Sequence, residues 1–261
     1  MTPLYEDRRR AESFGEDPDL YDRARPSYPA ALVDDLMADG PTDVIDVGCG
    51  TGIVSRIFIA RGCNVLGVEV DERMAGYARA HGVTVEVGKF ETWDSKGRQF
   101  DLLVSGQAWH WIDPLPGARA ASNCLHSGAR FAVFWNRQSY SKEVTDVLFE
   151  VYERLAPHLI GKSPLLYTLM GKEKADLDRD PVAVSLEECG GFDSIERRKY
   201  EWEREYAVDE WLGHVRTSSD HRLLPADELS ELLRELDKEL TKLGGRFVIH
   251  YDTYELTALK N

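Results

Sequence analysis

The stretch VIDVGCGTGIV, residues 44–54, decides the fold. A short and mostly apolar strand leads directly into three glycines, Gly48, Gly50 and Gly52, and then into a helical segment. Glycine tolerates positive φ and lets a ligand approach the backbone closely, as a tight strand-to-helix turn at the carboxyl edge of a parallel sheet requires. The stretch therefore predicts a ligand-binding turn.

Short apolar runs alternate with helical stretches on both sides of this turn. Five strands are expected, at 44–47, 65–70, 83–87, 101–104 and 130–135, separated by helices near 53–61, 71–80 and 114–125. Two later β-rich stretches, at 194–206 and 246–259, flank an apolar helix face that ends at Gly244-Gly245. The pattern predicts an α/β fold with a Rossmann-like, seven-stranded, mostly parallel sheet, helices on both faces and helical cap insertions.

The charge and the amino-acid composition limit the kinds of binding partner that we expect for this chain. The chain of 261 residues carries 46 acidic and 32 basic residues, a net charge of -14, which disfavours binding to nucleic acid. No run approaches the ~20 apolar residues of a membrane span, and the start lacks an apolar signal core, so we expect a cytoplasmic protein without a membrane partner. The cysteines and histidines lack metal-ligand spacing, so we expect reduced thiols and no metal.

Two carboxylates indicate the kind of ligand. Glu69 ends the second strand, twenty-three residues after Asp46, where a carboxylate can accept hydrogen bonds from ribose hydroxyls. Ile53 stands where the dinucleotide fingerprint needs its third glycine, and Asp46 places an anion where a pyrophosphate would sit. These features favour a cationic nucleoside over a dinucleotide.

The motifs VIDVGCGTG, VLGVEVDERM, GKFETW, FDLLVSGQAWHWID and RFAVFWN resemble the successive motifs of class I S-adenosylmethionine-dependent methyltransferases. The resemblance covers residues 14–136, the expected cofactor-binding core of a single domain over 1–261. The segment from Tyr21 to Pro29, together with the QAWHW run, is similar to the small-molecule branch that includes trans-aconitate methyltransferase-like proteins. The insertions at 140–190 and 208–244 are expected to cover a small-molecule substrate.

The resemblance implies a role for each residue that matches a motif. Asp46 and the glycine backbone would face the methionine portion of the cofactor, and Glu69 would bind the ribose. The other cofactor-binding residues that it implies are Tyr21, Arg25, Val70, Arg73, Phe90, Glu91 and Gln107.

The aromatic run after the fourth strand suggests the acceptor side of the site. His110 lies between Trp109 and Trp111, and it is either a general base for a hydroxyl or amine acceptor or a residue that holds its loop. Trp135 and Asn136 end the fifth strand and are candidates for substrate binding together with the two tryptophans.

We therefore expect a methyltransferase that acts on a small molecule at oxygen, either a carboxylate or a hydroxyl. One alternative is a non-catalytic nucleoside-binding or regulatory protein of the same fold, and another is a dinucleotide oxidoreductase. Candidate residues in or beside the insertions for lining the substrate cavity are Tyr140, Tyr152, Tyr167, Trp202, Trp211 and Arg216.

Overall fold

A computed structural model describes residues 4–6, 13–161, 163, 165–166 and 180–261. Its centre is one seven-stranded sheet in the order β3-β2-β1-β4-β5-β7-β6. The first five of these strands are parallel, and β7 runs antiparallel to both of its neighbours. The strands are β1 (Asp43–Val47), β2 (Asn64–Glu69), β3 (Thr84–Val87), β4 (Phe100–Gly106), β5 (Leu125–Tyr140), β6 (Phe192–Ala207) and β7 (Arg246–Lys260).

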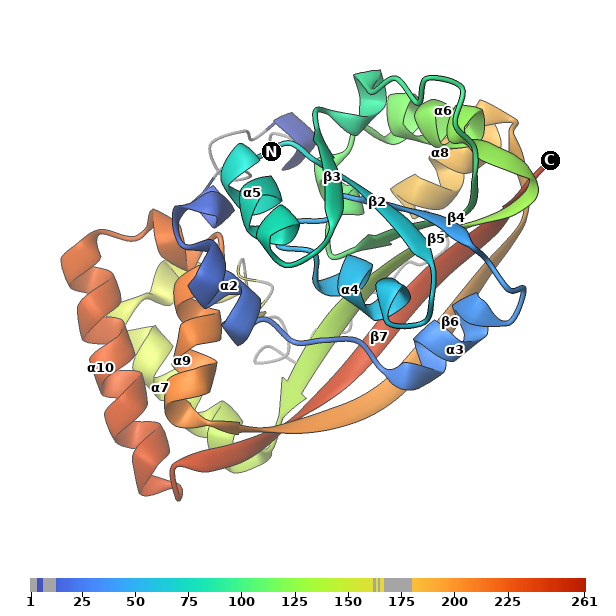
Figure 1. Cartoon of the computed structure of the whole chain (residues 1–261). Coiled ribbons are helices and arrows are strands. Elements are labelled where there is room, and N and C mark those ends of the chain that lie inside the picture. The colour runs from blue at the N-terminus through green and yellow to red at the C-terminus, as the bar shows by residue number, and fades with distance from the viewer. Residues whose placement is uncertain (1–3, 7–12, 162, 164, 167–179) are drawn as a thin grey trace.

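Helices cover both faces of this sheet (Figure 1). α3 (Ala30–Met37) and α4 (Ile53–Ile59) pack on one face with Val44 and Val104, and α6 (Pro114–Cys124) and α8 (Pro181–Cys189) pack on the other with Ile45 and Leu103. Adjacent residues of β1 thus point to opposite faces, as the two-residue period of a strand requires. α5 (Glu72–Ala80) covers the edge near β3. The predicted seven strands and two helical layers are confirmed.

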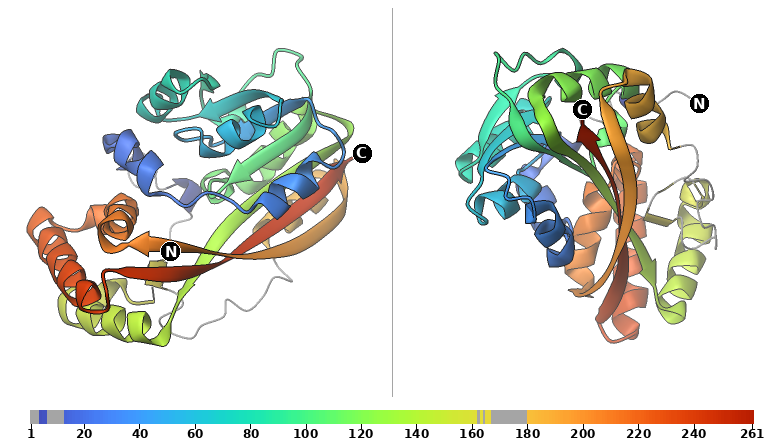
Figure 2. Two further views of the ribbon diagram at one scale, coloured as in Figure 1. Left: turned by 60° about the horizontal axis from the view of Figure 1, so that its bottom comes forward. Right: turned by 90° about the vertical axis from the view of Figure 1, so that its right-hand side faces the viewer.

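The three long strands β5, β7 and β6 extend beyond the core as a twisted ribbon, and a second group of helices packs at its far end (Figure 2). This cap consists of α7 (Lys142–Leu155), α9 (Val208–Thr217) and α10 (Ala226–Lys242), which share one hydrophobic cluster with the ribbon. α8 lies within the expected insertion 140–190 but packs on α6 and the core sheet instead. The described helices of the range 140–190 thus pack in two places, α7 in the cap and α8 on the core.

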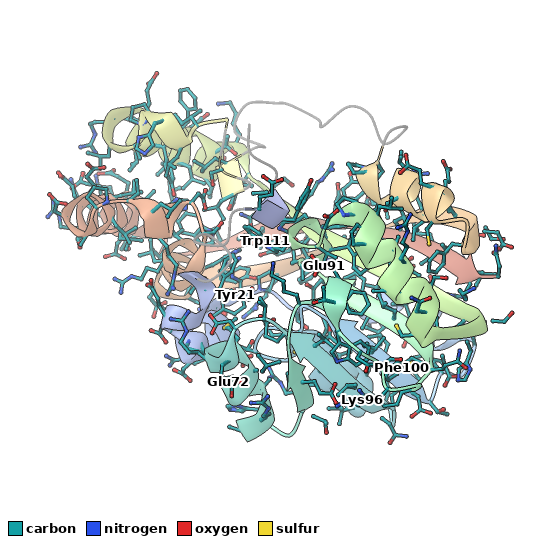
Figure 3. All side chains as sticks on the ribbon, turned by 90° about the horizontal axis from the view of Figure 1, so that it is seen from above. Tyr21, Glu72, Glu91, Lys96, Phe100 and Trp111 are labelled. Carbon is teal, nitrogen blue, oxygen red and sulfur yellow. The ribbon has the colours of Figure 1, made fainter. Side chains whose placement is uncertain are left out.

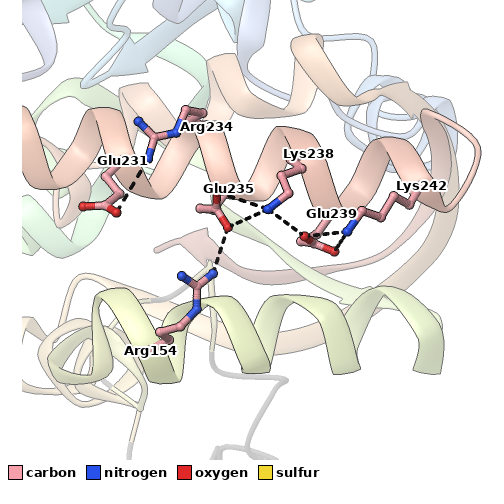
Figure 4. Close-up of polar contacts among 7 residues, drawn as sticks. All are labelled: Arg154, Glu231, Arg234, Glu235, Lys238, Glu239 and Lys242. Carbon is pink, nitrogen blue, oxygen red and sulfur yellow. Dashed lines mark hydrogen bonds and ion pairs between the residues drawn. The ribbon is translucent and has the colours of Figure 1, made fainter.

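The outer face of α10 is polar, and its inner face is buried. Leu232, Leu236 and Leu240 point into the cap cluster, as residues four apart on a helix do. On the outside, Glu235 accepts from Arg154 of α7 at 3.0 Å and from Lys238 at 3.3 Å (Figure 4). The Arg154–Glu235 ion pair joins α7 to α10 at the surface, whereas the Lys238–Glu235 pair lies within α10.

The N-terminal segment reaches across to the cap. α2 (Pro18–Ala24) begins at Asp17, whose side chain caps the helix by accepting from Leu20 N at 2.9 Å. α2 then packs on α9, where Gly213 leaves room for Ala24. The 3-10 turns Leu4–Glu6, Ser13–Glu16, Phe90–Thr92, Trp109–Trp111, Pro157–Leu159 and His221–Leu223 complete the described elements.

Candidate active site

The glycine turn closes the carboxyl end of β1. Gly48, Gly50 and Gly52 have φ values of 67°, 57° and 85°, in the left-handed region that favours glycine. Gly48 donates its N–H to Val68 O at 2.8 Å, which ties the turn to β2. A Cβ atom on Gly48 would lie 2.6 Å from the Cβ of Ala108, so the turn and the loop after β4 are in direct contact. The positive φ and this close packing together require glycine at position 48.

Asp46 lies beneath the turn with one carboxylate oxygen unused. Its side chain points to the α4 face, where Ser55 Oγ donates to Oδ2 at 2.6 Å, and it is only 1% exposed. Oδ1 is buried and has no hydrogen-bond partner among the described residues. Burial above all, with a smaller contribution from the charge of Glu69, raises the pKa of Asp46 to about 7. A buried carboxylate with a free acceptor fits a cationic ligand, such as the sulfonium and ammonium of S-adenosylmethionine.

Glu69 bridges the end of β2 and the glycine turn. Its Oε2 accepts from Gly50 N at 2.8 Å, and its Oε1 accepts from Val70 N and Asp71 N at 2.9 Å. Burial raises the pKa of Glu69 even though these three hydrogen bonds favour its ionised form. Three of about four acceptor positions are thus used, which leaves one for a hydroxyl of a bound ribose. Glu69 therefore also shapes the turn, a role that its position in the sequence did not indicate.

Val70 and Arg73, two of the residues expected to bind the cofactor, point in different directions. Val70 is exposed at the end of β2, whereas the Arg73 guanidinium turns back to form an ion pair of 2.6 Å with Asp71. The Ser13–Glu16 turn packs against this pair so closely that a Cβ on Gly15 would lie 2.1 Å from Asp71 Oδ2. The N-terminal segment thus lies over the start of α5, which the sequence pattern did not predict.

Phe90 and Glu91 follow β3. The Phe90 ring is 2% exposed and packs edge-on against Trp109 in the core, so this residue can offer a ligand its backbone and not its ring. Glu91 Oε1 accepts from Asp113 N at 3.0 Å and thereby joins this turn to the start of α6.

The loop after β4 holds His110 and Gln107. Gln107 has a φ of 57° and donates its side-chain N–H to Asn136 O at 3.2 Å. A non-glycine residue in this region costs about 1 kcal/mol or more, and such strain concentrates at functional sites. The His110 ring contacts β5, because Trp135 Nε1 donates to its Nδ1 at 3.1 Å, and β5 continues to Tyr140 and does not end at residue 135 as expected.

Asn136 joins three separate segments. Its Nδ2 donates to Ser27 O at 3.0 Å, and its Oδ1 accepts from Thr253 Oγ1 of β7 at 2.7 Å. These contacts fix the N-terminal segment to the carboxyl end of the sheet. The amide of Asn136 is thus occupied by protein contacts in this structure.

Aromatic rings gather beside this loop. Phe14 contacts both Tyr21 and Trp111 edge-on, with centroids 5.7 Å and 5.8 Å apart, and Figure 3 labels Tyr21 and Trp111 at this junction. The Arg25 guanidinium lies 4.6 Å from the centroid of the Tyr21 ring. Trp109, by contrast, is 2% exposed and belongs to the core. The sequence pattern did not single out Phe14.

Arg25 points toward the cap. Its Nη2 donates to Thr217 O, and its Nη1 lies 3.4 Å from Nε2 of the buried His214 in α9.

Tyr28 lies in the segment from Tyr21 to Pro29, and the sequence pattern indicated no role for it. Its partly buried ring packs on Phe134, and its hydroxyl approaches Gly106 at the end of β4. Burial raises the pKa of Tyr28, and the charge of Asp46 adds to this shift because the two residues are near each other.

The residues proposed to line the substrate cavity differ in burial. Tyr140, Tyr152 and Trp211 belong to or pack on the cap cluster, and Tyr152 Oη lies 2.7 Å from His221 Nε2. Trp202 stacks on Tyr251, Arg216 is exposed at the end of α9, and Tyr167 lies outside the described residues. No group of residues that could hold a metal is found within the described part of the chain, where all four cysteines are free thiols. No described helix is long and apolar enough to cross a membrane.

Comparisons with known proteins agree with this geometry. Residues 44–128 match a family described as a methyltransferase domain. An uncharacterized methyltransferase of Mycobacterium tuberculosis is 28% identical over 73% of this chain and 70% of its own length. A malonyl-[acyl-carrier protein] O-methyltransferase of Acetivibrio thermocellus is 21% identical over 93% of this chain and 89% of its own.

A solved structure shares the fold. A putative type II methyltransferase from Anaeromyxobacter dehalogenans superposes with a TM-score of 0.64 over 89% of this chain and 97% of its own, at 23% identity. The matched residues 44–128 contain the glycine turn, Asp46 and Glu69. Residues 44–128 thus form a methyltransferase domain, and the relatives and the shared fold support a class I S-adenosylmethionine-dependent methyltransferase with S-adenosylmethionine as its cofactor.

Proposed function

We propose that this enzyme methylates a carboxylate oxygen of a small organic acid in the cytoplasm. The observation that carries the choice of acceptor is the hydrogen bond from Trp135 Nε1 to His110 Nδ1. Neutral imidazole has one N–H group, and a nitrogen that accepts a hydrogen bond must present its lone pair. The proton of neutral His110 therefore resides on Nε2.

This tautomer decides what His110 can do. A protonated Nε2 donates a hydrogen bond and cannot remove a proton from a hydroxyl or an ammonium group. A carboxylic acid is already ionised at pH 7, because its pKa is near 4, and so it needs no base. A hydrogen-bond donor beside the acceptor suits a carboxylate, which it can orient. We therefore assign His110 a positioning role and set aside its role as a base.

The remaining residues of the site bind the cofactor and align it with the acceptor. The cofactor supplies a methyl group on a positively charged sulfur, which leaves as a neutral thioether. Asp46 and Glu69 bind the cofactor's cationic and ribose portions, and Gly48 allows close approach to the backbone. Phe14, Tyr21 and Trp111 exclude water from this edge of the sheet. Alignment and desolvation are the main requirements of such a transfer.

The names of two relatives support transfer to oxygen. One is the malonyl-[acyl-carrier protein] O-methyltransferase of Acetivibrio thermocellus. The other is a ubiquinone biosynthesis O-methyltransferase of Hahella chejuensis, 29% identical over 38% of this chain and 44% of its own. Trp111 and Trp135 remain our candidates for substrate contact. We assign Trp109 and Asn136 a structural role, because Trp109 is buried in the core and the Asn136 amide is hydrogen-bonded to other protein groups.

The chemistry of the product tests the proposal. The enzyme is incubated with methyl-labelled S-adenosylmethionine and a protein-free extract of small metabolites, and the products are then treated with mild alkali. Alkali hydrolyses a methyl ester and releases labelled methanol as vapour, whereas ethers and methylamines keep the label. We expect volatile label with the wild type and far less with Asp46→Asn. Label that stays in alkali-stable products would contradict carboxylate methylation and favour a hydroxyl or nitrogen acceptor.

A further inference from the structure

A cleft of about 430 Å³ opens between α2, α4 and β6. Figure 1 labels these three elements. Four of the nine lining residues are arginines, and Asp22 is the single acidic one among them. We call it the arginine cleft and define it by Arg23, Arg25, Arg56 and Arg204. A concentration of cations is unexpected on a chain with a net charge of -14.

The floor of the arginine cleft is apolar. Ile53, Ile57 and Ala60 lie four and three residues apart, so they share one face of α4 and its end. The floor starts at Ile53, the first residue after the glycine turn, and extends for about 10 Å along the helix. The cleft therefore combines an elongated apolar floor with cationic walls.

Three of the four arginines of the cleft form an ion pair with a carboxylate. Arg23 pairs with Asp19 at 2.7 Å, Arg56 pairs with Asp22 at 2.6 Å, and Arg204 pairs with Glu210. Each of these three arginines thus has one carboxylate.

Arg25 differs from the other three. Within the described residues its side-chain contacts are Thr217 O, His214 and the faces of aromatic rings, and its buried Nε has no hydrogen-bond partner. Burial, followed by the charge of Arg25, lowers the pKa of His214 well below its usual value, so His214 is neutral at pH 7. The charge of Arg25 is therefore left without a counterion in the cleft.

We propose that the arginine cleft binds a small organic anion through carboxylate or phosphate oxygens. A guanidinium presents five N–H donors and holds such oxygens in a bidentate manner, and the few contacts named above leave most of the donors in the cleft available. The apolar floor adds affinity for a hydrocarbon part of the ligand. If the anion is the far end of the methyl acceptor, the site rests on the proposed function and deepens it, and if the anion is a free phosphate, the site goes beyond that function. The anionic group is either the far end of the methyl acceptor or a free phosphate.

Calorimetry with three probes tests the site and separates these two sources. The enzyme is saturated with S-adenosylhomocysteine, so that no methyl transfer occurs, and it is titrated with adipate, hexanoate or inorganic phosphate. Adipate and hexanoate have the same carbon chain length but carry two carboxylates and one. Adipate binding that is tighter than that of hexanoate and phosphate identifies the far end of an organic acid. Phosphate binding at least as tight as that of adipate identifies a free phosphate.

Matched arginine variants show where the probes bind. The double variant Arg23→Gln/Arg204→Gln removes two of the four arginines of the cleft and changes no residue assigned to cofactor or acceptor binding. Arg61→Gln/Arg246→Gln removes two partly exposed arginines elsewhere, each with one carboxylate partner. We expect the cleft variant to bind the preferred probe on the order of tenfold more weakly, and the control to bind it like the wild type. The single variant Arg23→Gln, at a highly exposed position, repeats the test without disturbing the contact of Arg204 with Tyr206.

Several results would overturn the proposal. These are no detectable binding of any probe to the wild type, equal binding by the wild type and the cleft variant, or an equal loss in the control. Because calorimetry of these probes requires no turnover, such a failure would leave carboxylate methylation standing. Conversely, alkali-stable products would leave the arginine cleft standing.

Discussion

Replacing Asp46 with asparagine should strengthen the fold and weaken cofactor binding. Asparagine has nearly the same shape, and its amide oxygen can still accept from Ser55 Oγ. In the folded protein without cofactor, the pKa of Asp46 is about 7, against 3.8 for an unperturbed aspartate. Asp46 is therefore ionised at pH 8 at a cost to the folded state of about 4 kcal/mol. Asparagine carries no such cost.

The sign of the pH dependence follows from the raised pKa. The stability of the folded wild type relative to the variant is fully present below pH 3.8 and is lost as the pH rises through 7. Urea denaturation without cofactor should therefore show Asp46→Asn gaining about 4 kcal/mol relative to wild type between pH 4 and pH 8. The affinity for S-adenosylmethionine should fall about 10- to 100-fold at pH 8, because a hydrogen bond to a charged group is worth about 1.5–3 kcal/mol.

Glu255→Gln is the matched control. Glu255 lies on β7, and burial raises its pKa to about 7 as well. One of its carboxylate oxygens is likewise buried without a partner among the described residues. The control should therefore gain stability at pH 8 but bind the cofactor like the wild type. Asp46→Asn protein that binds S-adenosylmethionine within about twofold of the wild type would refute the reasoning, whatever its stability.

Three further substitutions test the site and the cap. Gly48→Ala should destabilise the protein more than Gly40→Ala in urea denaturation. Both glycines have φ near +65°, but only the added Cβ at position 48 clashes, 2.6 Å from Ala108 Cβ, so equal losses would count against the close packing. His110→Gln keeps an N–H donor and should retain kcat within about tenfold, whereas loss of a general base would lower kcat by about 10²–10⁴-fold. His110→Leu has no donor and should raise KM for the acceptor. Tyr152→Phe leaves His221 Nε2 buried without its 2.7 Å partner and should cost about 1–3 kcal/mol of unfolding free energy, and no measurable loss would contradict this contact.

Local patterns predicted the sheet well because each strand carries its own signal. The run from Val44 to Gly52 contains a strand, a turn and a helix start, and the structure has all three at those positions. The spacing from Asp46 to Glu69 placed both carboxylates at the carboxyl edge of adjacent strands. Periodicity also predicted α10 and its end at two glycines. These features depend on residues close together in the sequence.

Contacts between distant segments could not be predicted in this way. Sequence spacing does not show that Ser55 binds Asp46, that Phe14 meets Trp111, or that Arg25 reaches α9. Phe90 was expected among the cofactor-binding residues, but tertiary packing places its ring in the core, because an aromatic ring gains more by burial against Trp109. α8 begins at Pro181, inside the expected insertion 140–190, but its apolar residues pack on the core sheet.

Proton release on cofactor binding is the most direct test of the central claim that Asp46 holds the cationic part of the cofactor. At pH 6.5 a carboxyl with a pKa of about 7 is about three-quarters protonated, and a bound cation favours its ionised form. Calorimetric titration with S-adenosylmethionine in two buffers of different ionisation enthalpy should show about 0.7 proton released per molecule bound by the wild type, and close to none by Asp46→Asn. Equal proton release by the two proteins, or none by the wild type, would contradict the claim.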